Sequence, residues 1–294
     1  MIKNLSYSQL KKFFSLRPRE SHKGDYGHAL IIAGSSSYPG AAVLCANGCT
    51  RSGGGLVTLA YPESAGAAIL PRLYPEVMAL GLPDKNGAIS PSGAEKALKF
   101  IAARKVSSVA AGCGLTVSAD DKKFLKEFLA ANPVPAVIDA DGLNNFAGDT
   151  GVFGRLKSRA VLTPHPGEMS RLAGLSVPFI KNKMEECAAG FAEKYGVVCV
   201  LKGSRTVVAA GKGRVFASAA GNAGMAKGGS GDVLTGIIAA FIGRTEDFAG
   251  AVCAAVYLHG LAGNLAMDEK TDISMLPHDI IKNISGAVKK IRGR

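Results

Sequence analysis

Tryptophan is absent from this 294-residue chain, and aromatic residues make up only 6% of it, so Ala, Val, Leu and Ile are expected to build the core. The six cysteines are scattered through apolar stretches without a Cys-x-x-Cys pair, which predicts buried reduced thiols instead of disulfides or zinc ligands. No apolar run approaches the length of a membrane span, and the first six residues lack the apolar segment of a secretory signal. These absences predict a cytoplasmic protein without a membrane partner.

The net charge of +12 at pH 7 is compatible with two classes of partner, nucleic acids and small anionic molecules. The positive residues are spread along the chain apart from a basic tail at 289–294. No basic stripe alternates with aromatic residues, and no nucleic-acid-binding motif is present. We therefore expect a phosphate-rich small ligand and no nucleic acid.

A glycine-rich stretch at 221–236 carries a single carboxylate, Asp232, and passes at Val233 into an apolar helical pattern. The glycines of 228–231 let a ligand approach the backbone closely. The helix N-terminus that follows offers free N–H groups and the positive end of the helix dipole, so the pattern predicts a phosphate site. Asp232 in the first turn then suits a general base or a metal contact, although a glycine turn before a helix is often only structural.

Strands and helices alternate along most of the chain, as in βαβ units with a parallel sheet. One domain spanning 1–294 is expected, because no linker or change of composition divides the chain. The strand candidates are 27–34, 56–60, 74–80, 108–114, 134–139, 160–163, 197–201, 206–210 and 214–218. The helix candidates are 4–16, 40–52, 92–103, 120–131, 177–195, 231–243, 247–268 and 277–290, with a basic linker at 17–23. Glycines and acids at the strand ends should converge on one edge of the sheet and, with the helix at 231, surround a single cleft.

The segment 202–206 interrupts two β-branched stretches and is predicted to be a hairpin turn with a polar tip. Its cationic side chains, hydroxyls and backbone donors fit a nucleotide phosphate, although many such turns are only solvated. The residues are Lys202, Gly203, Ser204, Arg205 and Thr206.

Four further residues have both a functional and a structural interpretation. His165 lies between two prolines that fix its backbone, while Glu168 is as well explained by capping the next helix. Asp139 and Asp141, with Asn144 nearby, follow a strand and can hold Mg²⁺ or form an ordinary turn.

Cys113 lies in a glycine turn with no base beside it in sequence, so we interpret it as a small apolar filler.

Taken in order, seven stretches resemble the ADP/ATP-dependent NAD(P)H-hydrate dehydratases, a ribokinase-like repair family. The resemblance extends over nearly the whole chain from about residue 20. The stretches are 23–27, 34–42, 51–55, 139–144, 162–168, 201–203 and 222–236.

The resemblance implies a ribokinase-like α/β/α sandwich with a mostly parallel sheet, and a lyase that dehydrates the S epimer of hydrated NADH or NADPH (NADHX and NADPHX). ADP, or ATP, would be consumed with Mg²⁺ present. Residues 202–206 and Gly231 would contact the adenine nucleotide, and Ala41, Gly114, His165 and Asp232 the hydrated dinucleotide. Asp232 matches the superfamily's catalytic base, which would deprotonate the hydrate hydroxyl for attack on the terminal phosphoryl group.

The resemblance also implies self-association, as a tetramer, and a separate epimerase, because many relatives carry an epimerase domain ahead of this one that the sequence lacks. Cys113 stands where the family's glycine turn would have Pro. Met225, Lys227 and Ser230 differ from the residues that are usual in the family's version of the glycine-rich stretch. A small-molecule kinase of the thiazole, pyridoxine or sugar type and a non-catalytic adenine-nucleotide sensor remain alternatives.

Overall fold

The computed structural model describes residues 2–4 and 10–293, and ten of its strands form one sheet. These strands are β1 (Ile2–Asn4), β2 (His28–Ile32), β3 (Leu56–Pro62), β4 (Met78–Leu82), β7 (Ser108–Ala111), β8 (Ala136–Ile138), β9 (Ala160–Leu162), β10 (Val198–Leu201), β11 (Thr206–Ala209) and β12 (Val215–Ser218). Their order is β1-β12-β11-β10-β9-β8-β7-β2-β3-β4. A separate hairpin joins β5 (Asp84–Lys85) and β6 (Ala88–Ile89).

Neighbouring strands from β4 across to β10 are all parallel. The antiparallel pairs are β10 with β11 and β11 with β12, and β1 joins the edge parallel to β12. The mostly parallel sheet predicted from the alternation of strands and helices is therefore confirmed, as is the hairpin turn between β10 and β11.

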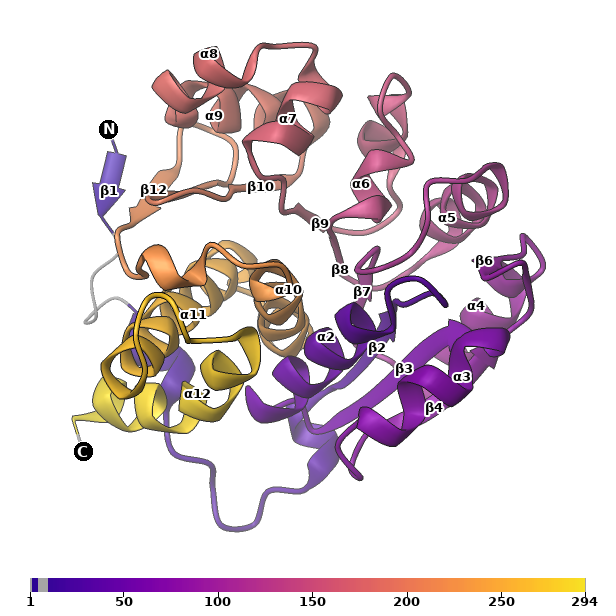
Figure 1. Ribbon diagram of the computed structural model, residues 1–294, viewed down its shortest axis with the longest axis horizontal. Helices are drawn as coiled ribbons and strands as arrows, with labels where there is room; N and C mark the ends of the chain where they lie inside the picture. Colours follow the sequence, from indigo (N-terminus) through magenta and orange to yellow (C-terminus); the bar gives the residue numbers. More distant parts are fainter. Residues whose placement is uncertain (1, 5–9, 294) are drawn as a thin grey trace.

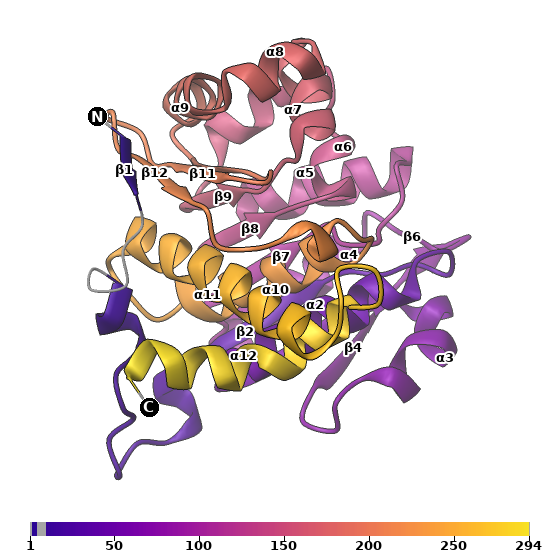
Figure 2. The same cartoon turned by 60° about the vertical axis from the view of Figure 1, so that its left-hand side comes forward.

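Helices cover both faces of this sheet (Figures 1 and 2). One face carries α2 (Pro39–Arg51), α10 (Ser230–Ile242), α11 (Phe248–Glu269) and α12 (Pro277–Arg292). The other carries α4 (Gly93–Arg104), α5 (Ala119–Ala131), α6 (Asp141–Asn144), α7 (Pro166–Ala173), α8 (Val177–Asn182) and α9 (Met184–Tyr195). Short connecting helices are α3 (Gly66–Ile69), η1 (Lys11–Phe14), η2 (Lys23–Tyr26), η3 (Glu63–Ala65), η4 (Leu70–Arg72), η5 (Thr150–Arg155) and η6 (Ala223–Met225).

The period-two alternation of the strands divides the interior into two apolar layers. In β2, Ile31 belongs to the layer under α2 and α10, whereas Leu30 and Ile32 belong to the layer under α4 and α5. All three side chains are fully buried. The central strands are therefore apolar on both sides, as expected for a parallel sheet covered by helices on each face.

Three sequence-based predictions of elements are wrong. The helix expected at 4–16 falls partly outside the described residues; within them, Asn4 ends a strand and only the 3₁₀ turn η1 forms. The strand expected at 74–80 begins at Met78, because Tyr74 starts a turn closed by the Val77 N–H. The single helix expected at 177–195 is two helices, because Lys183 has non-helical backbone angles and α8 packs on α7 while α9 packs on β10.

Helix α11 also corrects an expectation, because it is 22 residues long and contains an 18-residue window with a mean hydropathy of 1.4, which reaches the length and composition of a membrane span. Of its most apolar window, 67% is buried inside the molecule. The helix packs against α10, α12 and the hairpin strands β11 and β12. Packing in the interior accounts for its apolar composition.

The topology brings the carboxyl ends of β2, β7, β8, β9 and β10 to one edge of the sheet, since these strands are parallel. Helix α10 begins at this edge and runs along the sheet toward the opposite one (Figure 1). Loops that follow the strands and the first turn of α10 therefore surround the same space.

Candidate active site

A cavity of about 830 Å³ opens at this edge of the sheet, a size that suits a small-molecule or cofactor ligand. Its walls come from the loops after β8, β9 and β10 and from the glycine-rich segment 220–232. It brings together most of the residues predicted from sequence: Asp139, His165, Lys202, Gly203, Ser204, Thr206, Gly231 and Asp232.

A charged network forms the cavity floor. Lys202, whose side chain is 19% exposed, places Nζ 2.6 Å from Asp139 Oδ1 and 3.7 Å from Glu168 Oε2. Thr235 donates a hydrogen bond of 2.7 Å to the other Asp139 oxygen, so both oxygens of this buried carboxylate are engaged. Burial alone would lower the pKa of Lys202, but Asp139 and Glu168 raise it above its ordinary value. The ammonium is therefore a fixed positive charge in the cavity.

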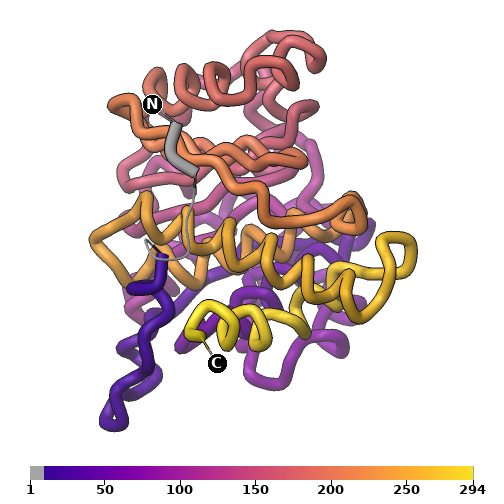
Figure 3. The backbone as a smooth tube through the Cα atoms, turned by 90° about the vertical axis from the view of Figure 1, so that its left-hand side faces the viewer, coloured from indigo at the N-terminus to yellow at the C-terminus, as the bar shows by residue number. Residues whose placement is uncertain are grey.

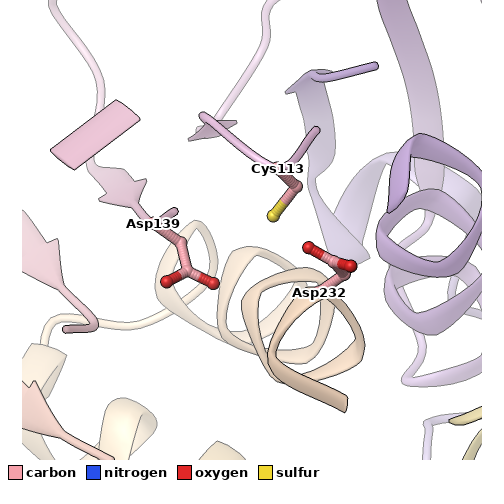
Figure 4. Close-up of side chains that lie close together, drawn as sticks. All are labelled: Cys113, Asp139 and Asp232. Carbon is pink, nitrogen blue, oxygen red and sulfur yellow. The ribbon is translucent and has the colours of Figure 1, made fainter. Parts of the chain in front are cut away.

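Asp232 lies beside this network, in the first turn of α10. Figure 4 shows its carboxylate directed toward the Asp139 carboxylate and the Cys113 thiol, and the three ligand atoms lie within 4.8 Å of one another. Burial, together with the negative charge of Asp139, raises the pKa of Asp232 to about 7, while a hydrogen bond from Cys113 opposes the shift. A carboxylate with a pKa near the working pH is suited to accept a proton.

The first turn of α10 is open toward the cavity, because no side chain in the described part of the chain caps it. Gly231 brings the backbone close to the network: a Cβ there would lie 3.3 Å from Lys202 Nζ. The turn thus combines backbone donors, the positive end of the helix dipole and an ammonium group, which together favour a phosphate.

Ala41 and Gly114 lie next to each other and do not line the 830 Å³ cavity. Gly114 has φ +66°, and a Cβ there would lie 2.7 Å from Ala41 Cβ, so only glycine allows this approach. The adjacent Cys113 reaches Asp232. The two residues therefore lie next to Cys113, outside the cavity that Asp232 lines.

His165 is the N-cap of α7. Its Nδ1 accepts the N–H groups of Gly167 (3.0 Å) and Glu168 (3.3 Å), while Glu168 Oε2 accepts the His165 N–H at 2.8 Å. Burial is the main cause that lowers the pKa of His165. The predicted capping role of Glu168 is confirmed, and the cap holds a neutral imidazole at the cavity wall.

Asp139 and Asp141, the two carboxylates considered for Mg²⁺ from the sequence, have different partners in the structure. Asp141 is absent from the cluster around Asp232, and its carboxylate accepts a hydrogen bond of 2.9 Å from Asn144, which in turn accepts one from Arg171. The cluster itself offers a thiol and an Asp139 carboxylate already bound to Lys202 and Thr235. Mg²⁺ prefers six oxygen ligands, so these residues do not form a protein-only site for it.

Arg205 is the one member of the 202–206 turn that does not line the cavity. Its Nη1 lies 2.8 Å from Glu185 Oε1, in the first turn of α9. The other four residues of the turn line the cavity, although the Thr206 hydroxyl donates to the Gly203 carbonyl at 3.3 Å.

The sequence analysis missed the roles of His259, Ser230 and Thr235. His259 Nε2 and Ser230 Oγ are buried at the cavity and have no hydrogen-bond partner in the described residues. Burial lowers the pKa of His259 to about 4, so it is neutral at physiological pH. The role of Thr235 could have been found from its spacing, because it lies three residues after Asp232 and residues at i and i+3 share one face of a helix. A lone histidine in the apolar α11 gave no comparable signal.

Cys113 was interpreted as an apolar filler, but its thiol contacts the Asp232 carboxylate. A hydrogen bond with Cys45 and burial raise the pKa of Cys113, so it is a neutral thiol and not a nucleophile.

Residues 29–285 match the model of a protein family described as NAD(P)H-hydrate dehydratase. The chain belongs to this family. It is 40% identical to a bifunctional NAD(P)H-hydrate repair enzyme of Moorella thermoacetica over 90% of this chain and 50% of that protein. It is also 35% identical to an ADP-dependent (S)-NAD(P)H-hydrate dehydratase of Bacillus subtilis, with 90% of each chain covered. The chain thus spans about half the length of the bifunctional relatives and most of the length of the monofunctional one.

Solved structures agree with this assignment. The fold superimposes with a TM-score of 0.86 on an ADP/ATP-dependent NAD(P)H-hydrate dehydratase of B. subtilis co-crystallised with ATP and Mg²⁺, at 32% identity and 99% of each chain. A ribokinase-like superfamily protein of Enterococcus faecalis gives a TM-score of 0.83 at 29% identity, over 99% of this chain and 96% of that one. The ribokinase-like α/β/α fold implied by the sequence resemblance is confirmed.

Proposed function

We propose that this protein dehydrates the S epimer of NADHX and NADPHX to NADH and NADPH, converting ADP to AMP and phosphate. The observation that carries this proposal is Asp232, a carboxylate with a pKa of about 7 at the open N-terminus of α10. Membership in the dehydratase family supports the substrate class, and the name of the B. subtilis relative supports the S epimer and ADP.

The adenine nucleotide occupies the 830 Å³ cavity in this proposal. Lys202, the backbone of Gly203, and the hydroxyls of Ser204 and Thr206 bind its phosphates together with the N–H groups around Gly231. Arg205 forms an ion pair with Glu185 in this structure, and in the proposal it contacts the nucleotide in exchange for that partner. ADP is the preferred donor, and ATP is the alternative that the B. subtilis crystal structure supports.

The hydrated dinucleotide contacts Asp232 from the side of Ala41 and Gly114 and extends to His165, which lies on the wall of the nucleotide cavity. Asp232 takes the proton from the ring hydroxyl, whose oxygen forms a bond to the terminal phosphorus of ADP while the bond between that phosphorus and AMP breaks. Lys202 and the helix N-terminus stabilise the charge on the transferred group. The lone pair of the ring nitrogen then expels phosphate, and loss of a proton from the adjacent carbon restores the double bond. The overall reaction is that of a carbon–oxygen lyase.

Mg²⁺ belongs with the nucleotide in this account. The protein's donors near Asp232 are too few and too engaged to form a full shell, whereas Mg²⁺ in nucleotide enzymes is bound by phosphate oxygens with one or two carboxylates. When bound, the ion neutralises phosphate charge. Asp139 and Asp232 would be the carboxylates that hold the ion together with the phosphates.

We further propose one domain over 1–294, a cytoplasmic location, and a homotetramer, as the family resemblance implies. A separate epimerase would supply the S epimer. The bifunctional names of several relatives support the link between these two activities.

An absorbance assay tests the function. Hydrated NADH is mixed with the full chain and Mg²⁺, with ADP, ATP or no nucleotide, and the reduced-nicotinamide band is followed. Return of the band only with nucleotide supports the dehydratase and identifies the donor. No return on fresh S epimer, or a stable phosphorylated product, would reject it in favour of a superfamily kinase.

A further inference from the structure

A second cavity, of about 630 Å³, lies at the opposite edge of the sheet from the active site. Tyr26 lies just before β2 and Gly53 just before β3, while Arg244 is the second residue after the end of α10. Figure 3 shows the N-terminal segment that contains η1 beside the C-terminal helix α12. Arg292 of α12 donates a hydrogen bond to the Phe14 carbonyl of η1. We call this cavity the basic pocket.

The basic pocket holds arginines that converge without an acidic partner. Arg17 Nη2 and Arg244 Nη1 both donate to the Gly53 carbonyl, at 2.7 and 3.2 Å. Arg51 and Arg292 also line the pocket. Among the described residues, no Asp or Glu forms an ion pair with any of these four arginines.

The two acidic residues that line the basic pocket are already engaged. Asp247 lies 2.6 Å from Lys12 Nζ, and it also accepts the N–H of Gly250. Asp25 accepts the N–H of His22 and lies beside its imidazole. Lys12 and Lys289 also line the pocket and balance the charges of these two carboxylates, so the four guanidinium groups leave a net positive charge there.

Tyr26 adds an independent observation. Its hydroxyl is buried in the pocket wall and has no hydrogen-bond partner among the described residues. The Arg17 guanidinium stacks 3.5 Å from the centre of its ring. A buried hydroxyl without a partner is costly to a fold, so its retention beside clustered cations points to a missing acceptor.

Burial, and then the charge of Arg17, lower the pKa of Arg244 to about 10. Repulsion between Arg17 and Arg244 therefore disfavours the charged form of Arg244, and an anion bound between the two groups would offset that repulsion. Guanidinium groups bind phosphate through paired N–H donors, and a tyrosine hydroxyl can donate to the same oxygens.

We infer that the basic pocket binds a small molecule carrying two or more phosphate groups. Four guanidinium groups without a carboxylate partner among the described residues match a multiply charged anion better than a single carboxylate, and 630 Å³ admits a small organic phosphate. The site is distinct from the nucleotide cavity, because the 13-residue α10 separates Asp232 from Arg244 by roughly 20 Å. The inference does not depend on the dehydratase reaction.

Binding of inorganic pyrophosphate to the full chain, measured by calorimetry at constant ionic strength, tests this site without requiring turnover. We expect Arg244→Gln to weaken one class of pyrophosphate sites by at least about 10-fold and Tyr26→Phe by a few-fold. Lys202→Gln, which changes the nucleotide cavity, should leave that class intact. Arg72→Gln is the matched control, since it removes an exposed arginine outside the pocket.

Tyr26→Phe keeps the test decisive if Arg244→Gln fails to fold, because it removes only an unpaired hydroxyl. Pyrophosphate binding that is lost in Lys202→Gln would place the anion in the nucleotide cavity only and overturn the inference. Equal weakening by Arg72→Gln and Tyr26→Phe, or no change in Tyr26→Phe and Arg244→Gln, would overturn it as well.

Discussion

The two ends of α10 each hold a charged group whose pKa is displaced toward the neutral form, but the neighbouring charges differ. At the N-terminal end, Asp232 shares its surroundings with Asp139 and the Lys202 ammonium, and its pKa of about 7 allows a proton to move at neutral pH. At the C-terminal end, Arg244 has a pKa of about 10, Arg17 as its charged neighbour and no carboxylate partner among the described residues, so it stays charged. Mixed charges at one edge suit proton transfer, and like charges at the other suit anion binding.

The largest effect is expected from Asp232→Asn. Loss of a general base should lower turnover by about 10²- to 10⁴-fold while both ligands still bind, as single-turnover kinetics and calorimetry would measure. Folding raises the pKa of Asp232, so this group's contribution to stability is lost as pH rises through 7. The variant should therefore melt higher than the wild type at pH 8 and no higher at pH 4. Near-normal turnover would remove the general-base assignment.

The pH dependence of the wild type tests the same carboxylate without a substitution. With a pKa of about 7, the ionised fraction of Asp232 and hence kcat/KM should fall by about 15-fold between pH 7 and pH 5.5. His259 does not contribute to this change, because its pKa of about 4 keeps it neutral over the range. A profile that stays flat over the range would contradict the role given to Asp232.

Lys202→Ala should weaken nucleotide binding by about 10- to 100-fold, since it removes a charged donor to phosphate. It also leaves Asp139 and Glu168 without their cation, which should destabilise the fold by about 3–5 kcal/mol. Addition of Asp139→Asn should recover part of that loss in thermal melts. The exposed Lys181→Ala serves as the control, and an unchanged nucleotide KM in Lys202→Ala would count against the contact.

The smallest effect is expected from His259→Phe. The substitution keeps an aromatic ring and removes the unpaired Nε2, but it also removes the hydrogen bond between the imidazole and the Ser230 backbone, so stability should fall slightly. If Nε2 donates to the bound nucleotide, the nucleotide KM should rise by about 2- to 10-fold with kcat little changed. Equal kinetics in the variant and the wild type would show that Nε2 makes no ligand contact.

The sequence predicted the active-site edge better than the basic pocket. Asp232, Gly231 and Lys202 lie in short motifs at the end of a strand or the start of a helix. The alternation of strands and helices along the chain was therefore enough to predict that they meet in one cleft. Ala41 and Gly114 followed only from family resemblance, because small residues carry no chemical signal.

The basic pocket could not be predicted, because its arginines are distant in sequence and converge only through tertiary packing. Arg17, Arg51, Arg244 and Arg292 come from four separate segments. The same limit explains why the helix predicted at 4–16 was wrong. Its apolar pattern does mark buried residues, since Phe14 is buried, but contacts with α12 set the local structure of η1 and override helical propensity.

An oxygen-18 label in the hydrate hydroxyl tests the central claim most directly. If Asp232 activates that hydroxyl for attack on ADP, the label must leave in the released inorganic phosphate, where phosphorus NMR detects it as an isotope shift. We expect one labelled oxygen per phosphate with the wild type and almost no turnover with Asp232→Asn. Unlabelled phosphate, with the oxygen-18 recovered in water, would show that ADP is cleaved separately and would contradict the mechanism.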